Sequence, residues 1–184
     1  QELARTNLEK LRQTAPQWYP VAAYLDRKGF PLYRNTQLHY LPTGEAYLDD
    51  MLTVLDTAQR FIFVEYFIMA EGQIWDRLSE ILCRKSRQGV EVKLIFDDFG
   101  SMMRMPNEKI DALQDAGVEV RVFNPVHHYV NRLYFNYRDH RKITCVDGDI
   151  AYTGGANIAD EYANLIERFG YWKDCGLRLE GEGA

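Results

Sequence analysis

The chain has few cysteines and no excess of positive charge. Its three cysteines, Cys83, Cys145 and Cys175, are far apart in the sequence, and no Cys-x-x-Cys pair occurs. This spacing favours free thiols in a reducing compartment over a disulfide framework. The net charge of -5 excludes a chain that binds nucleic acid through overall positive charge.

Long apolar runs are also lacking. The longest, residues 61–70, is interrupted by Glu65 and is shorter than the roughly 18 residues that a membrane-spanning helix needs. No signal peptide is recognisable. Even so, 46% of the residues are hydrophobic, so the chain can bury a substantial core. A length of 184 residues predicts one domain, or one domain with a short extension.

The spacing of apolar residues predicts alternating helices and strands. In residues 45–58 they recur as in an amphipathic helix, whereas residues 61–68 form the nearly continuous apolar run of a buried strand. The order of elements implies right-handed crossovers and a largely parallel α/β sheet. Helices are expected at about 1–13, 45–58, 74–82 and 107–113, and strands at 38–41, 61–68, 90–96 and 118–123, with an irregular stretch around Pro16, Pro20 and Pro31.

A β-hairpin is predicted near the middle of the second half. Two short apolar runs, residues 143–146 and 150–153, flank Asp147-Gly148-Asp149. An Asp-Gly pair between such runs is a strong hairpin signal. A helix is expected from about Ile158, and a last strand over residues 175–179.

Both ends of the chain look truncated. It begins with Gln1 instead of Met, and it ends at Ala184 soon after a predicted strand. We therefore expect a piece of a longer protein. Residues 1–36 would be an N-terminal extension or linker, and residues 37–184 the first domain of a longer protein with two motifs.

His140 and Lys142 form the first part of a candidate phosphodiester site. Two residues apart on an extended segment, their side chains point to the same side. The lysine can neutralise phosphoryl oxygens, and the imidazole can attack phosphorus or move a proton.

Thr153-Gly154-Gly155-Ala156-Asn157 brings the chain back after the hairpin. Gly154 and Gly155 allow close approach to a ligand, and backbone N–H groups at a helix start favour an anion. The Asn157 amide can donate a hydrogen bond to the same phosphate. Several different groups aimed at one anion predict a site, where any one of them alone would be a weak signal.

These residues resemble the signature of the phospholipase D superfamily. His140-x-Lys142-x4-Asp147 is followed at the family spacing by Gly154-Gly155-x-Asn157. Superfamily nucleases usually have Ser where this chain has Gly155, so the Gly-Gly form is similar to the first catalytic half of a bacterial cardiolipin synthase. The implied fold is α/β, a phospholipase D-like sandwich with a mostly parallel mixed sheet flanked by helices.

The resemblance also implies a role for each residue. His140 would be the nucleophile or its general-acid partner, and Lys142 and Asn157 would hold the phosphoryl oxygens together with Gly154 and Gly155. Asp147 would be mainly structural, tying the hairpin by hydrogen bonds. Asp174 would orient His140 and stabilise its charged form, as in a catalytic triad.

The implied reaction, in the parent, joins two molecules of phosphatidylglycerol or a related phospholipid into cardiolipin and releases glycerol, through a phosphohistidine. One imidazole cannot act on both faces of an in-line displacement, so the second motif must come from a second half of the parent or from a homodimer partner. The parent is expected at the cytoplasmic face of the bacterial cell membrane, and this fragment is expected to be soluble and nearly inactive.

Two other functions stay open. The first is a single-motif phosphodiesterase or nuclease that acts as a homodimer, and the second is a degenerate lipid-binding domain. The acidic balance and Gly155 argue against the first, and the intact motif argues against the second. We expect no cofactor, no metal site and no nucleic-acid partner.

Other polar and apolar features have plainer explanations. His127-His128 lack nearby ligands at zinc-like spacing and indicate a substrate-side loop or plain surface. Glu65, inside an apolar strand, either lines the site or forms a structural ion pair. Met102, Met103 and Met105 are more typical of loop filling than of lipid contact.

Overall fold

A computed structural model describes residues 2–126 and 136–184. The helices are α1 (Glu2–Thr14), α2 (Tyr19–Arg27), α3 (Gly44–Leu55), α4 (Gln73–Arg87), α5 (Asp98–Ser101) and α6 (Asn107–Asp115), with the 3₁₀ turns η1 (Pro16–Trp18) and η3 (Asp160–Ala163). The strands are β1 (Thr36–Leu41), β2 (Phe61–Tyr66), β3 (Glu91–Asp97), β4 (Glu119–Phe123), β5 (Lys142–Val146), β6 (Ile150–Gly154) and β7 (Gly176–Gly181).

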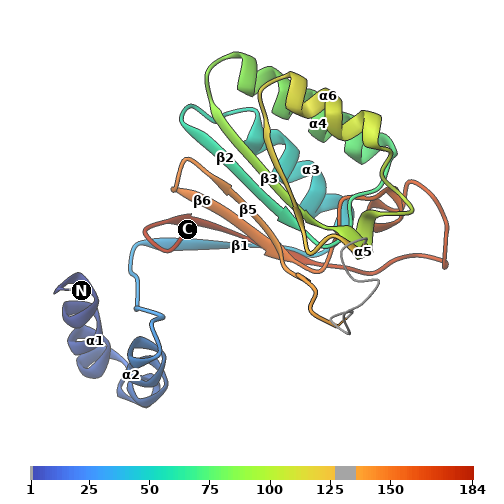
Figure 1. Cartoon of the computed structure of the whole chain (residues 1–184). Helices are drawn as coiled ribbons and strands as arrows, with labels where there is room; N and C mark the ends of the chain where they lie inside the picture. The colour runs from blue at the N-terminus through green and yellow to red at the C-terminus, as the bar shows by residue number, and fades with distance from the viewer. Residues whose placement is uncertain (1, 127–135) are drawn as a thin grey trace.

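The seven strands form one sheet in the order β1-β7-β6-β5-β2-β3-β4 (Figure 1). This confirms the predicted mixed α/β fold. Of the described strands, β1, β2, β3, β4 and β6 run in one direction, and β5 and β7 run in the other. Parallel hydrogen-bonded neighbours are β2–β3 and β3–β4. β5 returns antiparallel beside β2, and the remaining pairs are antiparallel as well. The hairpin and the strand after it therefore contribute more pairs than the helix-linked strands.

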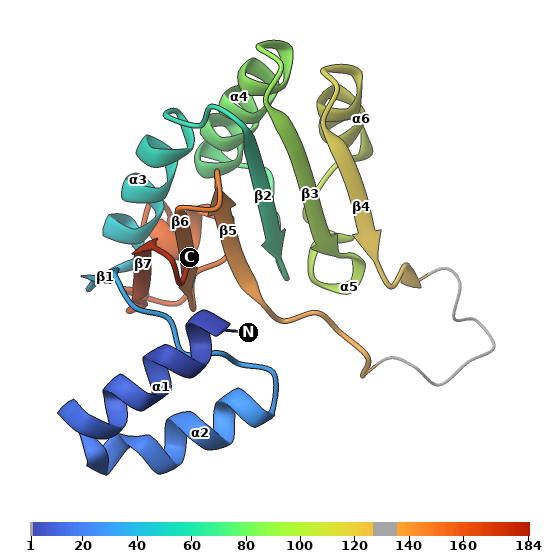
Figure 2. The same ribbon diagram turned by 90° about the vertical axis from the view of Figure 1, so that its left-hand side faces the viewer.

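The helices α3, α4 and α6 cover one face of the sheet (Figures 1 and 2). Burial in β2 follows from this arrangement, since Ile62, Val64 and Tyr66 are buried against the helical layer. Phe63 and Glu65, on the other face, are only half-buried. The apolar run that predicted a fully buried strand is thus buried on one face. The tyrosine hydroxyls of the core are paired, as in the hydrogen bond between Tyr47 and Tyr66.

The hairpin is confirmed, and the helix expected from about Ile158 is reduced to the short turn η3. The hairpin turn uses positive φ angles at Asp147 (57°) and Gly148 (79°). At η3 the Asp160 carboxylate turns away to accept hydrogen bonds from the N–H groups of Gln73 and Ile74, at 3.0 and 2.9 Å. It thereby caps the start of α4 and joins two parts of the domain that are distant in sequence.

The N-terminal helical unit, residues 2–34, lies apart from the sheet (Figures 1 and 2). The irregular stretch expected around the prolines contains η1 and α2 instead. Pro16 and Pro20 fall in the first turn of each element, where a missing N–H costs no helical hydrogen bond. Within the described ranges, no helix has both the length and the apolar character needed to cross a membrane.

Candidate active site

The predicted site residues gather at one edge of the sheet, with one exception. β2 and β3 end at this edge, and β5 and β7 begin here because they run antiparallel to their neighbours. His140 and Lys142 stand at the start of β5. Asn157 follows the end of β6, and Asp174 lies two residues before β7. Ligands of α/β sheets bind at the carboxyl ends of parallel strands, which is this edge.

His140 is exposed at this edge, and its ring lies 4.8 Å from the ring of Phe67. Partial burial and the charge of Lys142 lower the pKa of His140, whereas the charges of Asp139 and Asp97 oppose this shift. A lowered pKa leaves the imidazole neutral near pH 7, with a free nitrogen lone pair. That form can attack phosphorus or accept a proton.

Lys142 is buried beside His140. Its ammonium donates a hydrogen bond to the His140 carbonyl oxygen at 2.7 Å and lies 5.3 Å from the centre of the Phe67 ring. Burial lowers the pKa of Lys142, while Asp174 and Asp139 raise it. Phe67 thus contacts both motif side chains. The sequence alone did not single it out, although it directly follows the strand that pairs with the motif.

Asn157 is buried and held in one orientation. Its Oδ1 accepts a hydrogen bond from the Ile68 N–H at 2.9 Å, and its side chain also hydrogen-bonds the Tyr162 hydroxyl. These contacts tie the segment after β6 to the end of β2. They place the amide at the predicted site, and its contact with a phosphoryl oxygen stays a prediction.

The structure gives a reason for glycine in the Gly154-Gly155 pair that the sequence did not suggest. The Gly155 N–H donates to the Cys175 carbonyl oxygen at 3.2 Å, so it is not free for an anion, and no helix starts here. A Cβ atom at Gly155 would overlap the Asp174 carboxylate. The glycine therefore allows close packing against the segment before β7. The expected helix-start anion site is corrected accordingly.

Asp174 acts on Lys142 in this structure. Its charge raises the pKa of that lysine, and its carboxylate accepts hydrogen bonds from the Cys175 N–H at 2.8 Å and from the Trp172 indole at 3.4 Å. Among the described residues, no hydrogen bond joins Asp174 to the His140 ring. The orienting role implied by the resemblance stays a prediction.

Asp147 is the exception, because it lies at the far end of β5, about 16 Å along the strand from Lys142. Its carboxylate accepts hydrogen bonds from the N–H groups of Gln59, Arg60 and Phe61 at 2.8, 2.7 and 2.9 Å. Burial opposes ionisation, but these bonds outweigh it and lower the pKa of Asp147. The contacts attach the hairpin to the start of β2, and a direct catalytic role stays a prediction.

Asp97 fixes the segment before His140. Its fully buried carboxylate accepts hydrogen bonds from the Arg138 guanidinium at 3.1 Å and from the Asp139 N–H at 2.9 Å. It also caps α5 through the Phe99 N–H at 2.9 Å. The last residue of β3 therefore sets where the chain enters the motif. The sequence alone did not predict this role.

Glu65 forms an ion pair, one of the two alternatives that its sequence position left open. The Arg141 guanidinium lies 2.6 Å from the Glu65 carboxylate and 3.0 Å from that of Asp139. Burial, together with a hydrogen bond to Asp139, raises the pKa of Glu65 to about 7. The two carboxyls flank the residue that follows His140.

We expect the stability of the domain to fall as pH rises through the range set by Glu65. An unfolded glutamate has a pKa of about 4.3, whereas folding raises the pKa of Glu65 to about 7. The folded state binds more protons between these values, so the free energy of unfolding decreases as pH rises there. The pKa of Asp139 shifts down, so its contribution lies at lower pH. Glu65→Gln should therefore reduce the fall in the free energy of unfolding between pH 5 and 8, measured by urea denaturation.

Glu91→Gln is the matched control, because Glu91 is an exposed glutamate at the start of the neighbouring strand. It should keep the pH dependence of the wild type. If the free energy of unfolding fell equally steeply with pH in Glu65→Gln and in the wild type, Glu65 would not be the source of the pH dependence.

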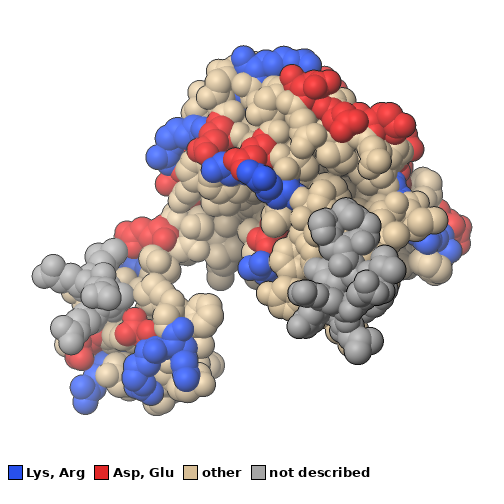
Figure 3. Space-filling model, in the orientation of Figure 1, with Lys and Arg blue, Asp and Glu red and all other residues tan. Residues whose placement is uncertain are grey.

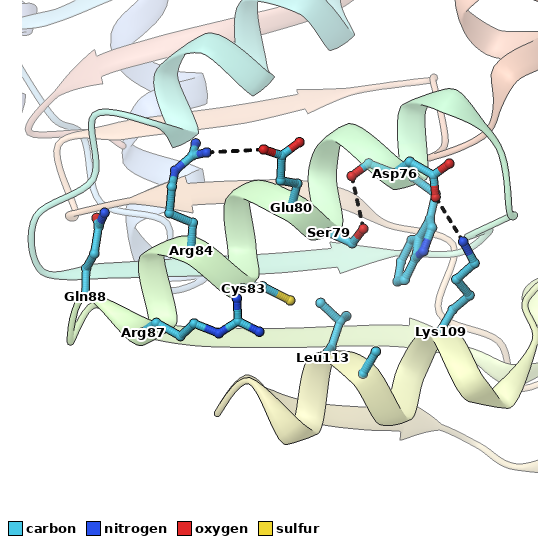
Figure 4. A pocket seen from close by; sticks show the side chains of 11 residues that line it. Asp76, Ser79, Glu80, Cys83, Arg84, Arg87, Gln88, Lys109 and Leu113 are labelled. Carbon is cyan, nitrogen blue, oxygen red and sulfur yellow. Dashed lines mark hydrogen bonds and ion pairs between the residues drawn. The ribbon is translucent and has the colours of Figure 1, made fainter.

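Two surface hollows differ in the chemistry they contain. One of ≈ 400 Å³ lies at His140, lined by Phe123, Tyr137, Arg138, Asp139, His140 and Arg141. A larger one of ≈ 620 Å³ lies between α4 and α6, where Lys109 and Asp76 pair across it at 3.1 Å (Figure 4). Its cysteine, Cys83, has a pKa raised by burial, so the thiol is not activated. The chemistry therefore points to the His140 edge.

The remaining sequence features do not add to the site. His127-His128 lie outside the described residues. Within residues 2–126 and 136–184, no three His, Cys, Asp or Glu side chains are grouped as a metal would require. Met103 is exposed, whereas Met105 is buried in the core.

Comparison with known proteins agrees with this geometry. The family described as "Cardiolipin synthase, PLD-like domain" matches residues 51–167. An uncharacterised protein of Streptococcus mutans is 44% identical over 96% of this chain and 38% of its own length. A cardiolipin synthase of Oceanobacillus iheyensis is 38% identical over 82% of the chain and 31% of its own length. The chain thus spans about a third of these relatives.

A solved structure supports the fold. Phosphatidylserine synthase of Haemophilus influenzae superposes with a TM-score of 0.61 at 17% identity, over 79% of this chain and 33% of that protein. The family match covers more than half of the chain, and His140, Lys142 and Asn157 lie at the carboxyl ends of β2 and β3. The chain belongs to the phospholipase D-like family of cardiolipin synthases.

Proposed function

We propose that the chain supplies one of two half-sites of a phosphatidyltransferase that makes cardiolipin from two phosphatidylglycerol molecules. The observation that carries this proposal is the pairing of an exposed His140 with the buried ammonium of Lys142 at the carboxyl edge of the sheet. Family membership and the similarity to cardiolipin synthases support the choice of reaction. The cytoplasmic face of a bacterial membrane would be the place of action.

The proposed chemistry is a double displacement at phosphorus. An imidazole nitrogen forms a P–N bond to the first phosphatidylglycerol while the P–O bond to its headgroup glycerol breaks. A second imidazole, on the opposite face, gives the departing glycerol its proton. The headgroup hydroxyl of the second phosphatidylglycerol then forms a P–O bond, the P–N bond breaks, and the second imidazole takes the proton back.

His140 is suited to the nucleophilic role in this reaction. Its lowered pKa favours the neutral ring that a nucleophile needs, and its exposure leaves the ring accessible. Lys142 would hold the non-bridging oxygens, with Asn157 donating to the same group. The second histidine has to come from elsewhere, either a further domain of the parent chain or a second copy.

The test compares the parent protein and the 184-residue chain on two substrates. The parent should convert phosphatidylglycerol vesicles to cardiolipin and glycerol in equal amounts, measured by mass spectrometry, and should leave single-stranded DNA intact. The isolated chain, shown to be monomeric by sedimentation, should give no turnover. Robust transfer by the monomer would remove the half-site proposal. If the parent cleaved DNA and did not act on phosphatidylglycerol, the proposed function would have to change to that of a nuclease.

A further inference from the structure

The N-terminal helical unit exposes an unusual amount of apolar surface. Trp18 is 62% exposed, Phe30 68% and Tyr24 54%. Val21, Leu25 and Tyr33 are exposed as well. α1 packs on α2 and η1, so the contacts of the unit are mostly internal. The aromatic and aliphatic side chains are left facing outward, and contiguous exposed patches of this kind mark interaction surfaces.

These side chains share one face of α2 and the turn before it. Trp18, Val21 and Leu25 follow the spacing i, i+3 and i+7, and Tyr24 stands beside them. At about 100° per residue, they occupy an arc of roughly 120°. An apolar face of this width is what an interfacial helix buries in a membrane surface.

The charge of the unit is opposite to that of the rest of the chain. Residues 1–36 hold six of the 22 Lys and Arg residues but only three of the 27 Asp and Glu residues. Their net charge is therefore about +3, whereas residues 37–184 carry about -8. Figure 3 shows basic side chains grouped on this unit at lower left, while acidic ones gather over α6 at upper right.

The cations lie close to the apolar face. Arg27 and Lys28 end α2, and the Lys28 ammonium lies 5.7 Å from the centre of the Tyr24 ring. Arg34 comes six residues after Lys28, directly after the exposed Tyr33. Trp and Tyr rings concentrate at the headgroup level of bilayers, and neighbouring Lys and Arg bind anionic headgroups. An anionic bilayer matches both the apolar face and the positive charge of the unit.

We propose that residues 18–34 dock on the surface of an anionic phospholipid bilayer. The apolar face of α2 enters the headgroup region, and Arg27, Lys28 and Arg34 contact the lipid phosphates. The choice of phosphatidylglycerol as probe rests on the proposed function, but vesicle binding does not require turnover. His140→Ala should therefore bind vesicles like the wild type, which separates the failure of one proposal from the failure of the other.

The experiment measures binding of the purified 184-residue chain to vesicles of phosphatidylcholine, with or without 30 mol% phosphatidylglycerol. The wild type should float with the anionic vesicles and bind neutral ones at least tenfold more weakly. Its tryptophan emission should shift to the blue on binding. Trp18→Phe should remove most of this shift, because Trp75 is fully buried and the half-buried Trp172 packs against Tyr162 and Phe169, outside the N-terminal unit. Trp18→Ser combined with Tyr24→Ser and Leu25→Ser should weaken binding at least tenfold.

Two further variants keep the result interpretable if the triple variant disturbs the helices. Arg27→Gln with Lys28→Gln preserves the apolar face, and should weaken binding severalfold at low salt but little at 0.5 M NaCl, where charges are screened. Val122→Ser with Phe169→Ser, exposed apolar positions elsewhere, is the control and should bind like the wild type.

Three results would overturn the proposal. The first is absence of binding to anionic vesicles, and the second is binding that neither the apolar nor the charge variant weakens. The third is a vesicle-independent dimer that the triple variant dissociates, because it would assign the face to a second copy of the chain.

Discussion

Replacing His140 by alanine in the parent protein is expected to lower the rate of phosphatidyl transfer by at least ~10³-fold. Alanine removes the nitrogen that would form the P–N bond or move the proton. Lys142, whose ammonium bonds the His140 backbone carbonyl, keeps its partner because that carbonyl remains. Substrate binding should therefore change much less than turnover.

Steady-state kinetics on phosphatidylglycerol vesicles, read as cardiolipin formed, would measure this loss. His39→Ala is the matched control, since His39 lies on β1 and pairs with Glu180 at 3.7 Å, far from the motif. It should retain wild-type turnover. Normal cardiolipin output from His140→Ala would show that the reaction does not pass through this residue.

The parts of the fold that sequence predicted are those with local causes. The Asp147-Gly148 turn needs positive φ angles that few residues adopt, so this dipeptide was enough to predict the hairpin. The helix over residues 45–58 was readable from periodicity and matches α3 closely. The order of the strands could not be predicted, because the partner of β5 is set by a non-local pairing with β2, which no local pattern encodes.

The site divides in the same way. The motif residues were found because three polar positions recur at fixed spacing, and the sheet brings His140, Lys142 and Asn157 to one edge. Phe67 and Asp97 were missed because their roles depend on strand ends that meet only in the folded chain. The reason for Gly155 was also non-local, since it is the Asp174 carboxylate that leaves no room for a side chain.

Asp97→Asn is expected to destabilise the domain and to weaken the hydrogen bonds that hold residues 138–139, just before His140. Both Asp97 oxygens accept hydrogen bonds, one from the Arg138 guanidinium and the other from the Asp139 N–H. An asparagine offers one acceptor, so its NH₂ group would face a donor inside a fully buried site. Removing one partner of a buried ion pair costs about 3 kcal/mol.

For a chain of this size, that loss corresponds to a fall in Tm of about 6–12 °C, measurable by calorimetry. Asp111→Asn, an exposed carboxylate on α6, is the matched control and should leave Tm nearly unchanged.

A second measurement separates positioning of His140 from stability alone. The negative charge of Asp97 raises the pKa of His140 and opposes the effects of burial and Lys142. Its removal should lower the pKa of His140 further, seen as a shifted proton NMR titration of the imidazole at a temperature where the variant is fully folded. A destabilised variant with an unchanged His140 titration would make Asp97 a purely structural residue. A lowered pKa would instead tie the end of β3 directly to the protonation state of the proposed catalytic group.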